Sequence, residues 1–186
     1  MVSSAAFLIA AAFVLWFCNR MNEFSQTDRV YMEWALSEAR QAAEAGEIPV
    51  GAVVVYNGAA IARGHNRREE LQNPMAHAEM SALQAASAHL NSWRLDECSL
   101  YVTLEPCVMC VGAILQARVS RLVFGCLDPK GGAVESLYRL CDDARLNHSL
   151  PVTRGILESE CSSILSEFFA DLRRKKAISG QPSAFS

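Results

Sequence analysis

Three side chains of the kind that bind zinc come from two separate segments of this chain, so any fold that uses them must bring those segments together. His77 opens the run HAE, and Cys107 and Cys110 lie at least thirty residues further on, in the run PCVMC. A structural zinc site normally has four protein ligands, whereas one histidine and two cysteines leave the fourth position open for water. A C-x-x-C pair on its own is more often a pair of buried core residues. The two segments together indicate a catalytic zinc site.

Glu79 is the carboxylate that this ligand set leaves free. Bound zinc lowers the pKa of its water towards neutrality, and a nearby carboxylate can take that proton and pass it to a substrate nitrogen. His77 and Glu79 are two residues apart, a spacing that does not place two side chains on one face of a regular helix. We therefore interpret Glu79 as the catalytic acid–base group, which approaches the water from the side, and not as a further ligand.

Both ligand segments are predicted to lie at the start of a helix. The alanine-rich run AHAEMSALQAASAH around His77 favours a helix, with Asn73 as a candidate N-cap. Pro106 suits the first turn of a second helix, which would carry Cys107 and Cys110 on one face. The dipole at a helix N-terminus favours a thiolate over a thiol. The two cysteines would therefore be held in the ionised form that zinc binds.

Helices and strands alternate along the chain from about residue 27, which predicts an α/β fold with parallel strand pairing. A hairpin is predicted at Asn57-Gly58, because this dipeptide is a strong signal for a two-residue hairpin turn. The predicted helices are Thr27 to about Ala45, the His77 helix, Cys107 to about Arg118, a weaker one near Ala133–Cys141, and about Leu157 to Lys175. The predicted strands are Pro49–Tyr56, Ala60–His65, Ser99–Thr103, Arg121–Gly125 and Val152–Arg154.

Composition predicts one compact domain that works inside the cell. The chain has 186 residues, of which 51% are hydrophobic, enough for a single core over residues 21–178, with 179–186 as a disordered tail. The formal net charge of −3 excludes a strongly basic nucleic-acid-binding protein, so any contact with RNA must come from local patches. Seven cysteines without a disulfide spacing are typical of the reducing cytoplasm.

Residues 1–20 do not fit this domain. They contain an uncharged apolar run, Ala5–Cys18, which is shorter than the roughly 20 residues that cross a bilayer. No lysine or arginine precedes the run, so the positive start of a secretory signal is missing. We interpret residues 1–20 as an upstream extension from a misassigned start. A membrane or interfacial anchor and an ordered packing segment are the alternatives, and the anchor alone would place the protein at a membrane.

Several short segments between about residues 25 and 175 form a specific pattern. They are IPVGA (48–52), GHNR (64–67), AHAE (76–79), LYVTLEPCVMC (100–110), FG (124–125), DPKGGA (128–133) and FF (168–169). In these segments the chain resembles the bacterial tRNA-specific adenosine deaminases, a family of zinc enzymes. The resemblance implies a cytidine-deaminase-like fold, in which a five-stranded mixed sheet lies between helices in three α/β/α layers. It also implies one zinc ion per subunit, a homodimer, and conversion of the wobble adenosine of a tRNA anticodon to inosine.

The same resemblance suggests which residues would contact the tRNA anticodon stem-loop. Asn66 would hydrogen-bond the base or its sugar, although an asparagine after a strand also commonly makes a turn. Asp128 and Lys130 lie in a turn rich in proline and glycine, where binding residues often occur but where a solvated turn would look the same. The basic run 173–176, which includes Arg173 and Arg174, is the candidate for phosphate binding, but its cations could instead balance the helix dipole.

Two other functions use the same residues. A small-molecule deaminase of the same fold, acting on guanine, cytosine or a pterin-like base, would share the zinc motif. A non-catalytic, zinc-stabilised RNA-binding module is the second rival. Glu79 argues against that module, because a structural site has no use for a free carboxylate and would need a fourth ligand.

Overall fold

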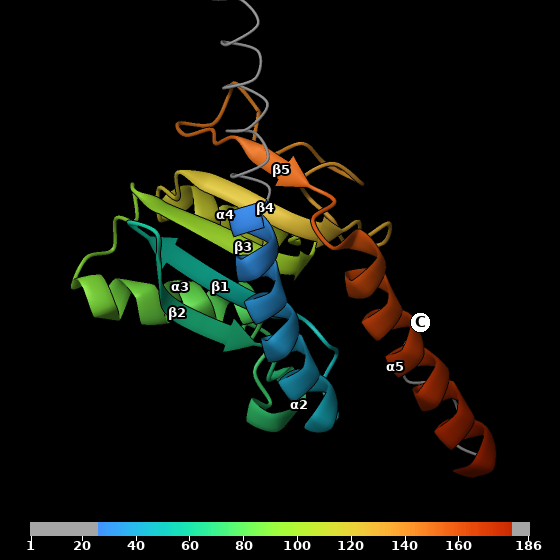
Figure 1. The fold of residues 1–186 in the computed structure, drawn as a ribbon. Coiled ribbons are helices and arrows are strands. Elements are labelled where there is room, and N and C mark those ends of the chain that lie inside the picture. Colours follow the sequence, from blue (N-terminus) through green and yellow to red (C-terminus); the bar gives the residue numbers. More distant parts are fainter. Residues whose placement is uncertain (1–25, 180–186) are drawn as a thin grey trace, which may run out of the picture.

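The computed structural model describes residues 26–179, which form a five-stranded sheet with helices on both faces (Figure 1). Our interpretations of residues 1–20 and of the tail from residue 180 lie outside the described residues. The chain is helical over residues 26–44, and the other helices are α2 (Arg68–Leu71), α3 (Ala78–Leu90), α4 (Val108–Gln116) and α5 (Glu158–Ser179). The strands are β1 (Gly51–Tyr56), β2 (Ala59–His65), β3 (Cys98–Leu104), β4 (Arg121–Cys126) and β5 (Val152–Arg154).

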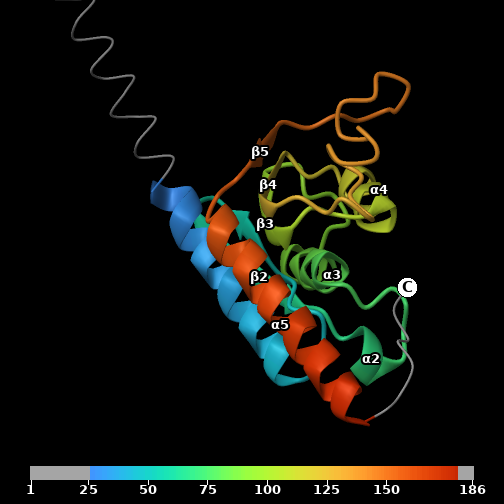
Figure 2. The ribbon, with the colours of Figure 1, turned by 90° about the vertical axis from the view of Figure 1, so that its right-hand side faces the viewer.

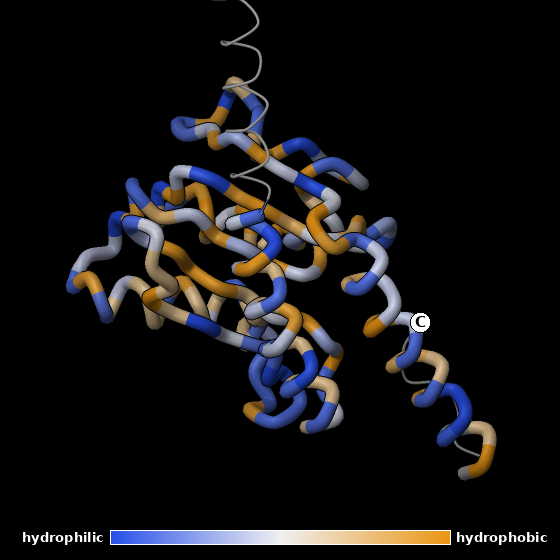
Figure 3. Tube along the Cα trace, in the orientation of Figure 1, coloured by the Kyte–Doolittle hydropathy of each residue, from blue (hydrophilic) through white to orange (hydrophobic). Residues whose placement is uncertain are grey.

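The sheet separates two hydrophobic cores because successive side chains of each strand point to opposite faces. In β1, Ala52 and Val54 belong to the core that α3 and α4 cover, whereas Val53 and Val55 belong to the core on the other face. Helix 26–44 and α5 cover this second face, as Figure 2 shows with the sheet seen nearly edge-on. Figure 3 shows hydrophobic residues concentrated along the strands between these layers. The predicted three-layer fold is confirmed.

Strand directions place one set of strand ends along a single edge of the sheet. The order is β2-β1-β3-β4-β5; β1 pairs antiparallel with β2 and β3, whereas β3 pairs parallel with β4 and β4 with β5. The carboxyl ends of β2, β3 and β4 therefore lie at the same edge. Asn66, Cys107 and Asp128 follow these three ends by one to three residues. The edge thus gathers residues that are far apart in the sequence, as in other open α/β sheets.

Most predicted elements are confirmed, and the exceptions have physical causes. The hairpin at Asn57-Gly58 forms with positive φ angles of 49° and 74°. The weaker helix predicted near Ala133–Cys141 is wrong, because this stretch forms turns and a buried carboxylate, Glu105, takes its backbone N–H groups. Asn73 does not cap α3. Its side chain accepts a hydrogen bond from the Met75 N–H at 3.0 Å and stabilises the turn before the helix.

A buried ion pair fixes helix 26–44 to the sheet. Asp28 is 5% exposed and accepts hydrogen bonds from Arg121 of β4 at 2.7 and 2.8 Å. The Tyr101 hydroxyl of β3 donates to the same carboxylate at 2.7 Å. Arg121 also donates to Thr153 of β5 at 2.9 Å, so one cluster joins the helix to three adjacent strands. Within residues 26–179, no helix combines the length and the apolar character that crossing a membrane requires.

Candidate metal centre and catalytic pocket

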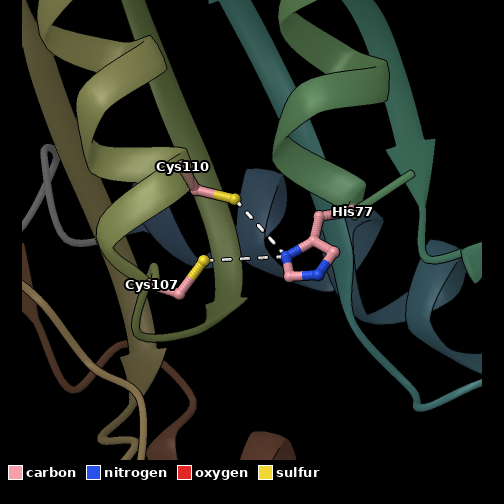
Figure 4. A group of neighbouring side chains, drawn as sticks. All are labelled: His77, Cys107 and Cys110. Atoms are coloured by element: carbon pink, nitrogen blue, oxygen red, sulfur yellow. Dashed lines mark hydrogen bonds between the residues drawn. The ribbon is translucent and has the colours of Figure 1, made fainter. Parts of the chain in front are cut away.

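The structure brings the three predicted zinc ligands together. The Nδ1 atom of His77 lies 3.7 Å from the Sγ atom of Cys107 and 3.5 Å from that of Cys110 (Figure 4). A tetrahedral zinc ion with bonds of about 2.3 Å to sulfur and about 2.0 Å to nitrogen separates these ligand atoms by roughly 3.6 Å. Over the described part of the chain, this is the one group of His, Cys, Asp or Glu side chains close enough to hold a metal ion. The donor set and its spacing therefore fit zinc.

Two helix starts hold the ligands. His77 is the N-cap residue of α3 and Cys107 that of α4, each in an extended conformation with ψ of 158° and 173°. Cys110 lies in the first turn of α4 and is fully buried. The predicted placement of both ligand segments at helix N-termini is confirmed, so the thiols lie in the favourable field of the α4 dipole.

The two candidate ligand thiols interact with each other, and this interaction moves their pKa values in opposite directions. A hydrogen bond from Cys110 and a second interaction with His77 lower the pKa of Cys107 to about 4. The pKa of Cys110 is raised by its hydrogen bond to Cys107 and by burial. The interaction with Cys107 also raises the pKa of His77. Binding of a metal by both sulfurs would release any proton that they hold, since thiolates are the ligating form.

Glu79 lies in the first turn of α3, beside the metal centre. It is 4% exposed, and burial raises the pKa of its carboxyl group, against the opposing effects of its own backbone N–H and of His77. Its side chain also interacts with Cys110. A carboxyl group whose pKa is raised towards neutrality can both accept and donate a proton, which is the property that the predicted role requires.

A cavity of about 150 Å³ opens onto the metal centre. Among the residues that line it are two of the predicted RNA-contacting residues, Asn66 and Asp128, together with His77, Glu79 and Cys107. Asn66 is 6% exposed, and its amide group donates to Glu47 at 3.2 Å. The second oxygen of Glu47 accepts the Glu70 N–H at 2.7 Å, so the acid is held from two sides and fixes Asn66 at the cavity wall.

The structure places the other predicted RNA-contacting residues outside this cavity. Lys130 is exposed, and its N–H donates to the Asp128 side chain at 3.0 Å within the turn after β4. Arg173 and Arg174 are exposed near the end of α5, and Arg174 pairs with Asp171. Their contact with RNA stays a prediction.

Arg68 also lines the cavity, from α2, a short helix that was not predicted. Sequence analysis missed two acids that line or support the cavity. Glu47 and Glu105 are 1% and 2% exposed. Burial would raise the pKa of Glu105, but hydrogen bonds from Ser136 and from backbone N–H groups lower it overall. Both acids stand shortly before a proline in the sequence, a signal too weak to reveal a buried carboxylate.

Comparison with known proteins agrees with this geometry. Residues 26–173 match the family described as MafB19-like deaminase. The tRNA-specific adenosine deaminase of Bacillus subtilis (strain 168) is 51% identical over 149 residues, which cover 80% of this chain and 92% of that relative. The tRNA-specific adenosine deaminase of Haemophilus influenzae is 46% identical over 155 residues, which cover 83% of this chain and 90% of that relative.

Two solved structures share the fold. One comes from biochemical and structural studies of A-to-I editing by tRNA:A34 deaminases at the wobble position of transfer RNA. It is 49% identical, with a TM-score of 0.71, and the match covers 73% of this chain and 98% of that chain. Guanine deaminase from Nitrosomonas europaea is 27% identical, with a TM-score of 0.68, and the match covers 76% and 84% of the two chains. By its family match and by these identities, this chain belongs to the deaminase family that contains the bacterial tRNA-specific adenosine deaminases.

Proposed function

We propose that this chain hydrolyses adenosine to inosine at the wobble position of a tRNA anticodon and releases ammonia. The observation that carries the proposal is the buried Glu79 carboxyl group, which faces the same cavity as the three-ligand centre of His77, Cys107 and Cys110. Three ligands with an adjacent free acid form a catalytic and not a structural arrangement. The 51% identity to a tRNA-specific adenosine deaminase supports the choice of substrate.

His77, Cys107 and Cys110 would hold one zinc ion per subunit. When bound, zinc would lower the pKa of a water molecule and so supply the nucleophile for C6 of adenine. Glu79 would take the proton from this water and deliver it to N1 of adenine. The same carboxylate would then take the proton of the new hydroxyl group at C6 and pass it to the amine. The C6 carbonyl group forms as the C6–N bond breaks, so that one water is consumed and one ammonia leaves for each inosine formed.

The size of the cavity limits the part of the substrate that it can enclose. Its volume of about 150 Å³ is well below the roughly 300–1,000 Å³ of pockets that enclose whole drug-sized ligands. The base alone would enter, turned out of the RNA stack, while its sugar and the flanking nucleotides stay outside. Asn66 and Asp128 would contact the base or its sugar at the cavity wall. Exposed Lys130, Arg173 and Arg174 would contact the anticodon stem-loop beyond it.

A small-molecule deaminase is the second candidate, because the N. europaea guanine deaminase has the same fold at 27% identity.

A single panel of substrates distinguishes the tRNA deaminase from the small-molecule deaminase. The zinc-loaded protein is incubated with an anticodon stem-loop that carries adenosine at the wobble position, with the same RNA in which the adenosine is moved by one nucleotide, and with free guanine, cytosine and adenosine. We expect inosine and ammonia from the first RNA only. Ammonia from a free base, with none from RNA, would favour the small-molecule enzyme instead.

We also propose that the protein is a homodimer. A groove of about 650 Å³ runs between α3 and α4, on the face opposite helix 26–44. Three large apolar side chains along it, Leu71, Met75 and Trp93, are 49%, 57% and 62% exposed. Contiguous exposed apolar surface of this kind marks an interaction site in a soluble domain. A second copy of the chain is the occupant that we propose.

We place the enzyme in the cytoplasm, where its tRNA substrate would be. Every residue assigned to metal, proton transfer or RNA lies beyond position 60, so a protein that starts at Met21 should be as active as the whole chain. Cell fractionation with an antibody to the domain, together with mass spectrometry of the native N-terminus, tests both statements. Native protein that starts at Met1 and sediments with membranes would contradict them.

A further inference from the structure

Glu105 is a buried carboxylate to which the proton-transfer mechanism gives no role. One of its oxygens accepts the backbone N–H groups of Val134, Glu135 and Ser136 at 3.0, 2.7 and 2.9 Å. The other oxygen accepts the Asp128 N–H at 3.0 Å and the hydroxyl group of Ser136. All five donors belong to one loop. A carboxylate that accepts several hydrogen bonds inside a protein is held firmly, since hydrogen bonds to a charged group are the strong ones.

This loop has no regular secondary structure of its own. Between the end of β4 at Cys126 and the start of β5 at Val152, the chain forms only turns and one isolated bridge, from Gly132 to the metal-ligating Cys107. Gly132 packs so closely that a Cβ atom at this position would overlap the Glu105 carboxylate. The loop is therefore fitted to Glu105 at both its beginning and its middle.

Glu105 also connects the loop to the metal centre. It lies two residues before Cys107 and lines the same cavity as Asp128. The candidate metal ligands are held at the starts of α3 and α4. The loop also meets the start of α4 through its backbone, by the bridge from Gly132 to Cys107 and by a hydrogen bond from the Ala133 N–H to the Pro106 carbonyl group at 2.9 Å. A change of the Glu105 side chain leaves these backbone groups in place, so it would loosen the wall that carries Asp128 and Lys130 while the ligands keep their places.

The geometry points to Glu105 as the positioning residue that holds loop 128–136 against the cavity, so that the loop can bind the anticodon nucleotides. This inference rests on the proposed function for its substrate. It assigns Glu105 to substrate binding and not to the chemical step. The role depends on an anion, because a neutral amide of the same size offers one acceptor oxygen and turns an N–H₂ group towards N–H donors.

Glu105→Gln is the first test. We expect stoichiometric zinc, a Michaelis constant for the anticodon stem-loop that rises about tenfold or more, and a kcat that changes by less than about threefold. Hydrogen exchange of the amides of Val134, Glu135 and Ser136 should become at least about tenfold faster. Wild-type exchange rates in this variant, or a loss of kcat and zinc without a change in the Michaelis constant, would overturn the inference.

Two further variants keep the test decisive. Asp142→Asn removes a charge from the same segment between β4 and β5 but outside loop 128–136. The Asp142 side chain pairs with exposed Arg139, so exchange and kinetics should match the wild type. Ser136→Ala deletes the hydroxyl donor to Glu105 and keeps the Glu105 carboxylate itself. If Glu105→Gln does not fold, faster exchange in Ser136→Ala supports the inference and unchanged exchange contradicts it. Because exchange needs no substrate, a wild-type protein inactive on RNA would defeat the proposed function without deciding the role of Glu105.

Discussion

Two buried carboxylates line the same cavity in opposite electrostatic settings. Burial raises the pKa of Glu79, whereas the donors around Glu105 lower its pKa in spite of burial. Opposite pKa shifts of this kind suit the two carboxyl groups to different roles. A group with a raised pKa can carry a proton, whereas a group with a lowered pKa stays an anion. Glu79 is thus suited to proton transfer and Glu105 to holding the loop.

Glu79→Gln should abolish most turnover while leaving the metal centre intact. The amide has nearly the same volume but cannot carry a proton between water and N1 of adenine. We expect single-turnover rates to fall by about 10²- to 10⁴-fold, with unchanged zinc per subunit by elemental analysis. Glu69→Gln, a change at an exposed acid of α2, serves as the control. Near-normal rates in Glu79→Gln would exclude the mechanism.

Glu47→Gln should destabilise the protein, because Glu47 is 1% exposed and both of its oxygens accept hydrogen bonds. The amide leaves one donor facing another, at a cost of about 1–3 kcal/mol in the free energy of unfolding. Urea denaturation measures this cost. Glu44→Gln, at an exposed position of helix 26–44, should change the same quantity by less than about 0.5 kcal/mol. Equal effects of the two substitutions would show that the Glu47 contacts contribute nothing.

Elements that depend on local sequence were predictable, and those that depend on remote contacts were not. The Asn57-Gly58 hairpin and the helix starts near His77 and Cys107 follow from short-range signals. The stretch 133–141 has a helical pattern, but a carboxylate thirty residues away takes its N–H groups. The candidate site divides in the same way. The spacing of His77, Cys107 and Cys110 pointed to them as candidate metal ligands, whereas Glu47 acquires its role only when the chain is folded.

Asp28→Asn should loosen helix 26–44 from the sheet. Removing one partner of a buried ion pair costs about 3–5 kcal/mol. The Arg121 side chain keeps 28% of its surface exposed, so we expect about 2 kcal/mol less unfolding free energy in urea. Asp96→Asn breaks the exposed pair with Arg94, and its cost should stay below about 1 kcal/mol. A cost for Asp28→Asn no larger than for Asp96→Asn would contradict this role of the ion pair.

The basic end of α5 should contribute to RNA binding through charge alone. Figure 1 shows this end extending away from the sheet, and Arg173 and Lys175 are exposed there. The double change Arg173→Ala and Lys175→Ala should weaken binding of the anticodon stem-loop. In a plot of the logarithm of the binding constant against the logarithm of the salt concentration, the magnitude of the slope should fall by about 1–2. Arg94→Ala, near the amino end of β3, is the matched control. An unchanged slope would mean that these cations only balance the helix dipole.

For the whole molecule, we propose that the dimer forms through the layer of α3 and α4, and not through the layer that contains helix 26–44. Trp93 lies in the groove between α3 and α4, whereas exposed Val30 lies on helix 26–44, on the other face of the sheet. Trp93→Asp should therefore dissociate the proposed dimer to the 20.4 kDa monomer in sedimentation analysis, because an unpaired charge would be buried in the interface. Val30→Asp should leave the dimer intact. A wild-type protein that sediments as a monomer at micromolar concentration would contradict the proposal.

The most direct test of the proposed reaction follows the oxygen atom. A tRNA with adenosine at its wobble position is incubated with the zinc-loaded protein in water enriched in ¹⁸O, and the nucleosides and the ammonia are then measured by mass spectrometry. Hydrolysis at the His77, Cys107 and Cys110 centre predicts inosine at that position with one solvent oxygen in the base and one ammonia for each inosine. The Glu79→Gln protein should give neither product. An unmodified wobble nucleotide with the wild-type protein, or inosine without the solvent label, would contradict the proposed reaction.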